Sequence, residues 1–275
     1  MVLESLLNPK RAGDKPLYVF LVAFFYTLIA VMFSNQLFPS QASILSVTLI
    51  TIIFIPFFQK MFEIEEFKED LAAEGKTHDN LFSRHAKSLI IFTTFFLGVT
   101  IAMSFIFIFF PHTYLNTFSL QLDWFSNQGI FPVGQATAGA PDFSTLFLNN
   151  TQVMLLLFML SIVFGAGAIF ILVWNASIIA VFLGIFIRSF IEQGFPITVA
   201  YLFGVPIGLS SIALHGIPEI LAYFFAGLAG GILSVGIIRE KIMSKEFTEV
   251  FKDALVFLLF AEVLILIAAL VEAAL

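Results

Sequence analysis

Eight long apolar runs dominate this sequence and restrict it to folds that cross a membrane. A hydrocarbon core about 30 Å thick takes roughly 20 residues of α-helix at about 1.5 Å each. Because an unpaired backbone amide in lipid costs several kcal/mol, we interpret all of these runs as helical. The runs cover residues 17–37, 41–58, 89–110, 151–173, 175–187, 197–213, 216–238 and 254–271.

The composition agrees with a polytopic membrane protein and narrows its chemistry. Of 275 residues, 60% are hydrophobic and 12% are charged, a balance far from that of soluble domains. Because the chain has no cysteine, disulfides, thiolate metal sites and cysteine nucleophiles are excluded. The formal net charge of -6 lies on connecting segments, so we expect no nucleic-acid partner. We also expect no cofactor.

The basic residues indicate how the chain is oriented. Of the 13 Lys and Arg, three precede residue 16, five lie between Lys60 and Lys87, and four lie between Arg239 and Lys252. The loop over 111–150 has none. Under the positive-inside rule we expect the N-terminus and both basic segments in the cytoplasm, and 111–150 outside the cell membrane.

The number of crossings then restricts the second half of the chain. Passing from outside at 150 to inside at 239 needs an odd number of crossings, yet four apolar runs lie between. Gly204, Pro206 and Gly208 interrupt the run 197–213, so we predict that it is broken or re-entrant. A kinked but spanning helix is the alternative. The predicted fold class is all-α: a polytopic transmembrane helical bundle of about seven spanning helices plus this segment.

Charge and hydropathy divide the chain into four parts. We expect an N-terminal basic segment and first transmembrane hairpin at 1–58, a cytoplasmic amphipathic helical segment at 59–88, a third transmembrane helix and outer loop at 89–150, and a membrane core with a C-terminal helix at 151–275. The mixed charges and spaced apolar residues of 59–88 predict a helical hairpin broken near Gly75. We interpret His78 and His85 within it as surface histidines rather than a metal site.

Polar residues at predicted membrane depth are few, and because burying them is expensive they are candidates for function. The set is Asn175, His215, Glu219 and Glu262. His215 and Glu219 are four residues apart and flank Pro218, a pattern that suits the first turn of a helix. They either cap that helix and bond to backbone freed by Pro206, or line a polar cavity together with Glu262. Both interpretations stay open.

We assign no catalytic residues. A zinc hydrolase needs three protein ligands plus a water, yet the predicted membrane segments contain one histidine and the chain has no HExxH motif. Ser210 and Ser211 lie near His215, but no GxSxG motif or suitably spaced acid accompanies them. We therefore predict a protein without enzymatic activity and keep an intramembrane hydrolase as the weaker alternative. Whether a metal binds stays open.

Small residues and a sequon complete the sequence features. Gly227 and Gly231 form a GxxxG motif, and Gly165 and Gly167 lie in the predicted 151–173 helix; close backbone approach at such positions predicts tight helix packing and, less directly, a homodimer. Asn149 begins an Asn-Asn-Thr sequon on the predicted outer side, so it is a candidate for glycosylation. We interpret Asn175 as a helix N-cap or an interhelical hydrogen-bonding group.

The stretch from 149 to 238 combines an Asn-rich helix start, a glycine-rich helix and the sequence HGIPEILAYFFAGLAGG. In these features the chain resembles the stage II sporulation protein M family, and NPKRA near the N-terminus is similar to the archaeal members. Ala176 departs from the family, which often has glycine there. The family's features fall on Asn149, Asn150, Gly165, Asn175, Gly184, His215, Gly216, Glu219 and Gly227.

The resemblance implies an integral membrane protein that is not itself an enzyme, since the namesake is a membrane partner of peptidoglycan-degrading proteins in spore-forming bacteria. It also adds Gly184 to the packing glycines. We therefore expect a membrane scaffold or assembly partner in the lipid bilayer, associating with itself or with another membrane or envelope protein. The alternative is a transporter or channel-like protein with an ion or small polar solute path lined by His215, Glu219 and Glu262.

Overall fold

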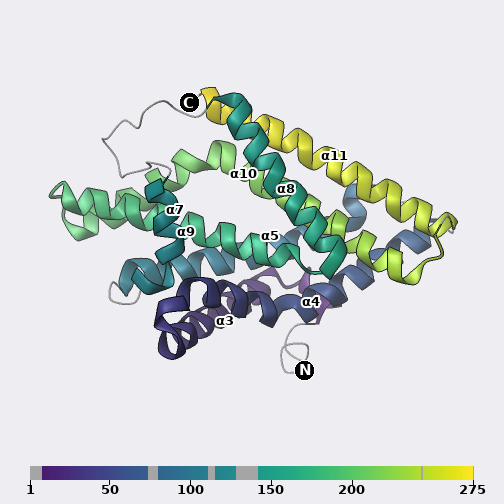
Figure 1. The fold of residues 1–275 in the computed structure, drawn as a ribbon, viewed down its shortest axis with the longest axis horizontal. Coiled ribbons are helices and arrows are strands. Elements are labelled where there is room, and N and C mark those ends of the chain that lie inside the picture. Colours follow the sequence, from purple (N-terminus) through teal and green to yellow (C-terminus); the bar gives the residue numbers. More distant parts are fainter. Residues whose placement is uncertain (1–7, 74–79, 111–114, 128–141, 243, 275) are drawn as a thin grey trace.

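The structure, a computed structural model, describes residues 8–73, 80–110, 115–127, 142–242 and 244–274. Helices make up almost all of this part of the chain, and no strand occurs in it. The predicted all-α class is confirmed, and most of the long helices run along the longest axis of the molecule (Figure 1). The elements are α2 (Pro9–Ala12), α3 (Pro16–Leu37), η1 (Pro39–Gln41), α4 (Ala42–Ala73), α5 (Leu81–Phe109), α7 (Ser119–Asn127), α8 (Phe143–Phe164), α9 (Ala168–Glu192), α10 (Ile197–Arg239) and α11 (Lys245–Ala274).

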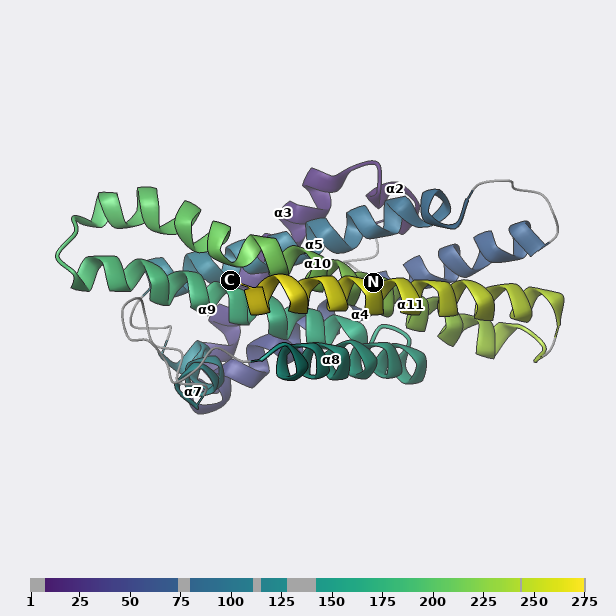
Figure 2. The same cartoon turned by 90° about the horizontal axis from the view of Figure 1, so that it is seen from above.

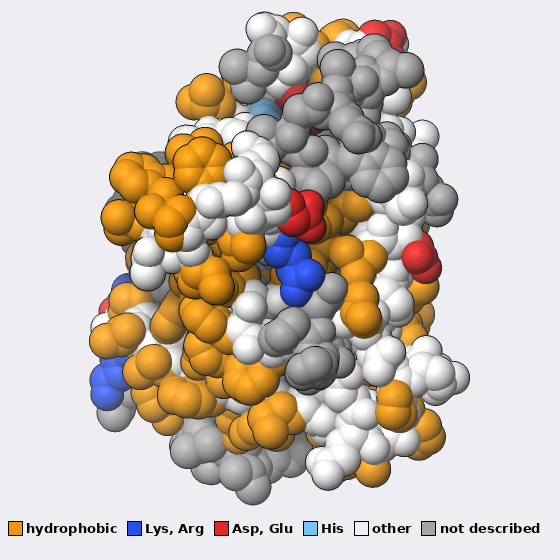
Figure 3. Space-filling model, turned by 90° about the vertical axis from the view of Figure 1, so that its left-hand side faces the viewer, with side chains coloured by type: hydrophobic (Ala, Val, Ile, Leu, Met, Phe, Trp, Pro, Cys, Tyr) orange, Lys and Arg blue, Asp and Glu red, His pale blue; other side chains and the backbone are white. Residues whose placement is uncertain are grey.

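Seven helices in the described ranges are long and apolar enough to cross a membrane: α3, α4, α5, α8, α9, α10 and α11. The chain is a multi-pass membrane protein. Large apolar side chains remain exposed along these helices, as expected of surfaces that face lipid. Figure 3 shows the end of the molecule where α9 meets α10, and there hydrophobic side chains cover much of the described surface.

Contacts between helix ends give the direction of each span. Lys87 near the start of α5 pairs with Asp14 just before α3, at 2.6 Å, so α3 and α5 begin at the same end. Arg239 at the last residue of α10 contacts Glu63 of α4 at 3.2 Å, which places the end of α10 there too. We call this end, where Lys87 and Arg239 lie, the basic end. Helices α3, α5, α9 and α11 run away from it, and α4, α8 and α10 run toward it.

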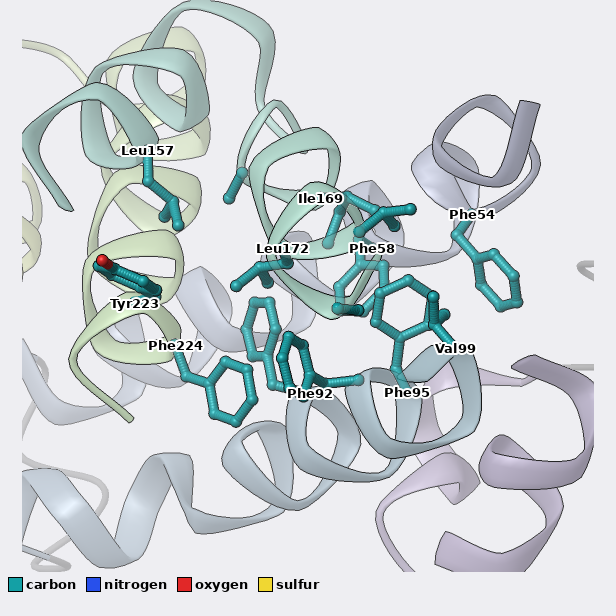
Figure 4. Packing of buried hydrophobic residues seen from close by; sticks show 14 of the residues in the cluster. Phe54, Phe58, Phe92, Phe95, Val99, Leu157, Ile169, Leu172, Tyr223 and Phe224 are labelled. Atoms are coloured by element: carbon teal, nitrogen blue, oxygen red, sulfur yellow. The ribbon is translucent and has the colours of Figure 1, made fainter. Parts of the chain in front are cut away.

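Phenylalanine rings from α4, α5 and α10 form the centre of the core (Figure 4). The ring centroid of Phe58 lies 5.0 Å from that of Phe92 and 5.1 Å from that of Phe95. Phe92 in turn stacks on Phe224 of α10 with centroids 5.6 Å apart. Such aromatic pairs each add about 0.5–1.5 kcal/mol beyond the burial of their surface, so this cluster fixes how α4, α5 and α10 pack.

The helix α10 corrects the prediction for 197–213. It runs without interruption for 43 residues from Ile197 to Arg239, about 65 Å of helix, so the expected broken or re-entrant segment is wrong. Pro206 and Pro218 lie inside it; each removes only one backbone donor, and a bend absorbs the clash. Figures 1 and 2 show α10 following a bent path.

The turn between α8 and α9 also differs from the prediction. The expected helix over 151–173 ends at Phe164, and α9 begins at Ala168. Gly165 has φ +67, a backbone conformation that side chains with a Cβ rarely adopt, so the chain reverses there rather than near 174. Three candidate spans, α8, α9 and α10, therefore lie between 150 and 239, which agrees with the odd number that the basic residues predict.

The segment 59–88 forms the ends of two spanning helices rather than a separate unit. Helix α4 continues to Ala73 and α5 begins at Leu81, so the described parts of 59–88 are helical, as predicted. Asn80 caps α5, because its side chain accepts a hydrogen bond from the Ser83 amide at 2.8 Å. The break predicted near Gly75 and the residue His78 lie outside the described residues.

Part of the predicted outer loop is helical. Helix α7 crosses the direction of α9 (Figure 1), and α8 begins at Phe143. The buried Gln121 of α7 donates to Ser177 of α9 and accepts from Ser43 of α4, both at 2.8 Å. Helix α7 is thereby fixed to the end of the bundle that lies opposite the basic end.

Candidate functional site

The four polar residues predicted at membrane depth do not converge on one site. Asn175 lies within α9 and donates to the Ile171 carbonyl of its own helix at 2.8 Å, so the N-cap interpretation is wrong. Glu219 accepts a hydrogen bond from the Tyr223 hydroxyl at 2.7 Å. Glu262 accepts one from Thr151 of α8 at 3.0 Å. These three residues therefore have separate partners.

His215 and Glu219 lie in the middle of α10 rather than at a helix start. The predicted first-turn role is wrong because the helix continues through Pro218. Glu219 and Tyr223 are four residues apart, so they face the same side of α10, and Tyr223 is fully buried. Glu272 of α11 lies within electrostatic range of both. Nδ1 of His215 is buried and has no hydrogen-bond partner within the described part of the chain.

The bond between Thr151 and Glu262 links α8 to α11. Thr151 is the hydroxyl residue of the sequon that begins at Asn149. Asn149 itself is exposed in the second turn of α8. The candidate glycosylation site is therefore part of a regular helix, and its threonine hydroxyl is bonded to another span.

The predicted packing glycines fall into two groups. Gly184, Gly227 and Gly231 lie inside helices at close contacts: a Cβ on Gly231 would be 2.5 Å from the ring of Phe62, and one on Gly227 would be 3.1 Å from Ala168. A Cβ on Gly184 would overlap the ring of Phe107. Gly165 and Gly167 instead form the turn between α8 and α9.

A charged cluster that the sequence did not predict lies at the basic end. We define the charged cluster as Glu65 and Glu69 of α4, Arg84 and His85 of α5, and Asp253 of α11. His85 Nδ1 lies 2.6 Å from Glu65 Oε2, and its Nε2 contacts Glu69. Arg84 contacts Glu69 at 2.5 Å and Asp253 at 3.5 Å. Three helices therefore meet through ionisable side chains.

The prediction that His85 is a surface histidine is wrong. Its side chain is fully buried, because α4, α5 and α11 pack around it and the Phe257 ring lies 5.3 Å from its own ring. The signal in the sequence was the spacing of Glu65 and Glu69, which puts two carboxylates on one face of a helix. Buried charges need partners, and the pair on α4 supplies them for His85.

A second set of ion pairs lies beside the charged cluster. Arg239 of α10 contacts Glu63 at 3.2 Å and Glu66 at 3.3 Å. Lys68 contacts Glu65 at 2.7 Å and donates to the Arg84 carbonyl at 3.0 Å. Four of the helices that begin or end at the basic end, α4, α5, α10 and α11, are therefore connected through charged side chains.

Neither polar region has the arrangement of a known catalytic site. Among the described residues no group of three or more His, Asp or Glu side chains is arranged to bind a metal ion. The hydroxyls of Ser210 and Ser211 donate to carbonyls of their own helix, Ile207 and Gly208, at 2.8 Å. Neither hydroxyl therefore has the hydrogen bond to His215 that would activate it as a nucleophile.

Comparison with known families agrees with this architecture. A family model described as stage II sporulation protein M matches residues 17–275, which covers all seven spans. The chain belongs to the stage II sporulation protein M family. Comparison with curated proteins and with solved structures found no match. The family match supports the earlier resemblance, and it identifies this chain as a membrane protein of that family.

Proposed function

We propose that this stage II sporulation protein M family protein is a non-enzymatic membrane scaffold or assembly partner. The observation that supports this function is the pairing of its intramembrane carboxylates. Glu219 bonds to Tyr223 within α10, and Glu262 bonds to Thr151 between α8 and α11. A transport path needs polar groups that face a shared passage, whereas these groups are paired with side chains of the protein at separate places.

If the protein is a scaffold, each part of its surface has a different partner. The spans contact the lipid bilayer of the cell membrane, and a second copy or another membrane or envelope protein would associate with the helix ends. In this orientation the N-terminus and the basic end face the cytoplasm, and the segment 111–150 faces outward. Reporter fusions at the N-terminus and within 111–150 test this orientation.

One observation favours a second candidate function, a transporter or channel-like protein. Buried Nδ1 of His215 has no hydrogen-bond partner within the described residues, and such a group is costly unless something binds to it. In this function His215, Glu219 and Glu262 line a path for an ion or a small polar solute.

Purified protein in liposomes separates the two functions. We expect the wild-type protein to give no proton, Na⁺ or K⁺ flux above that of empty liposomes, and we expect Glu219→Gln to give none either. The matched variant Tyr223→Phe leaves the buried Glu219 without its hydrogen bond, so it should lower the free energy of unfolding by about 1–3 kcal/mol. A protein-dependent flux that Glu219→Gln abolishes would support the transporter and contradict the scaffold.

A further inference from the structure

Helix α8 is the least buried of the seven spans. Its buried side chains are Met154, Leu157 and Ser161, and the last two lie against glycines of α10. The opposite face of α8 is exposed and lies along one side of the molecule (Figure 2). In the membrane this face is covered either by lipid or by another molecule, and the side chains on it indicate which.

Two amide side chains lie on the exposed face of α8. Asn149 and Gln152 are both exposed and are three residues apart, so they are neighbours on one side of the helix. Neither side chain makes a hydrogen bond within the described part of the chain. An amide has two N–H donors and a carbonyl acceptor, so both residues present unused donors and acceptors to whatever surrounds α8.

Both amides lie at membrane depth. The 22 residues of α8 form about 33 Å of helix, close to the roughly 30 Å of the hydrocarbon core, so the two ends of α8 lie near the two interfaces. Gln152 is nine residues beyond Phe143, about 14 Å along the helix axis, which is further than its side chain can extend back. Because hydrocarbon offers no hydrogen bonds, lipid is a costly cover for these amides.

The amides continue into an apolar row on the same side of α8. Leu156, Met159 and Val163 are exposed, and together with Asn149 and Gln152 they repeat at spacings of three and four residues. We call these five residues the α8 seam. Heptad spacing of this kind is typical of two helices that pack side by side, and a polar residue within it fixes the register and the number of helices.

A second copy of this chain supplies the hydrogen bonds that the seam lacks. Two copies inserted in the same direction have parallel α8 helices, and a two-fold axis along the membrane normal places each residue opposite itself at the same depth. An amide opposite an identical amide can both donate and accept. A span of a different protein would need polar groups at the depths of both Asn149 and Gln152, so a second copy is the better fit.

We propose that the protein forms a parallel homodimer through the α8 seam, with Asn149 and Gln152 hydrogen-bonded to their counterparts in the second copy. This inference rests on the proposed scaffold function and deepens it, because it names a second copy as a partner and places that copy along α8 as well as at the helix ends. The GxxxG glycines that suggested a homodimer do not make this contact, since Gly227 and Gly231 pack inside the bundle.

Single cysteines can map the seam because the chain has no cysteine of its own. In the membranes of expressing cells oxidised with copper phenanthroline, we expect Leu156→Cys and Val163→Cys to form disulfide-linked dimers. The matched controls are their neighbours Leu155→Cys and Phe164→Cys, which lie about 100° around the helix. Val163 and Phe164 are 64% and 63% exposed, so accessibility does not distinguish them. Equal cross-linking at seam and control positions, or none at the seam, would overturn the proposal.

Replacement of the amides tests their role in pairing. An interhelical hydrogen bond in a membrane corresponds to about 3-fold to 30-fold in an association constant, so we expect Asn149→Leu and Gln152→Leu each to weaken dimerisation by that factor. Energy transfer between copies labelled at Thr248→Cys, an exposed position of α11, measures dimerisation in liposomes as the ratio of protein to lipid is varied. The exposed control Leu155→Ala should leave it unchanged.

A loss of dimer in these variants does not reflect a loss of fold. Both amides are exposed and unbonded within the described chain, so helix content and detergent-induced unfolding should stay as in the wild-type protein. Unchanged dimerisation in the variant that combines Asn149→Leu with Gln152→Leu would contradict the proposal. A wild-type protein that is monomeric at every lipid ratio and gives no ion flux would overturn the α8 dimer alone, whereas a flux that Glu219→Gln abolishes would contradict the scaffold function.

Discussion

Two glycines of α10 allow a sharp test of helix packing. A Cβ on Gly230 would lie 2.5 Å from the Phe158 carbonyl oxygen and 2.6 Å from the Ser161 Cβ, whereas a Cβ on Gly216 would meet nothing within 4 Å. Gly230→Ala therefore forces α8 and α10 apart. The same substitution at Gly216 adds a methyl group in open space.

The comparison isolates the contact because both variants replace glycine within the same helix. Each gains about 0.5–1 kcal/mol from the better helix propensity of alanine, and this gain cancels in the difference. Overpacking costs about 1–3 kcal/mol, and the close atoms at Gly230 include backbone, which cannot move as a rotamer does. We expect Gly230→Ala to be less stable than Gly216→Ala by about 1–3 kcal/mol.

Reversible unfolding in mixed micelles with an increasing fraction of denaturing detergent measures this difference, with helix content and tryptophan fluorescence as two signals. Gly216→Ala should be at least as stable as the wild-type protein. If the two alanine variants unfold at the same detergent fraction, α8 does not approach Gly230 as closely as the structure shows, and the packing argument fails.

Two further predictions concern the end of the bundle opposite the basic end. Gln121→Leu removes the bonds to Ser43 and Ser177 and should cost about 1–3 kcal/mol in the same unfolding measurement, whereas exposed Leu120→Ala should cost less. Hydrogen bonds from the hydroxyls of Ser144 and Thr145 lower the pKa of Asp142. The stabilisation that the Asp142 cap gives to α8 is therefore fully present at pH values above the ordinary pKa of Asp, and it is lost as the pH falls through the lowered pKa. Exchange of the Thr145 amide should therefore speed up at low pH relative to Asp142→Asn, and an identical pH profile in both proteins would contradict the cap.

The sequence predicted about seven spans because hydropathy marks the apolar runs and the basic residues require an odd number of crossings between 150 and 239. The basic residues predict opposite sides for 150 and 239, and the three candidate spans between them agree with that parity. The prediction that 197–213 is broken or re-entrant failed because a proline removes one backbone donor without ending a helix. Pro206 and Pro218 both lie within α10, where Gly204 and Gly208 pack on α9 and the helix bends instead of breaking.

The turn at Gly165 was missed for a related reason. Glycine in an apolar run allows either close helix packing or a reversal of the chain, and the two uses have the same local sequence. Only the backbone angle, φ +67, distinguishes them. Asn175 was taken for the turn because asparagine favours helix starts, but its side chain bonds back to its own helix.

The two polar regions differ in what they join, and this difference bears on function. Glu219 bonds within one helix and Glu262 joins two, so a change at either affects a local contact. The charged cluster joins α4, α5 and α11, and Arg239 adds α10 through the neighbouring ion pairs. A protein that works by assembling with partners needs a way to connect events at a helix end to the arrangement of its spans. In this chain the charged cluster is placed to do so, and it contains His85, which the sequence analysis assigned to the surface, because periodicity identifies the face of a helix but not what packs against it.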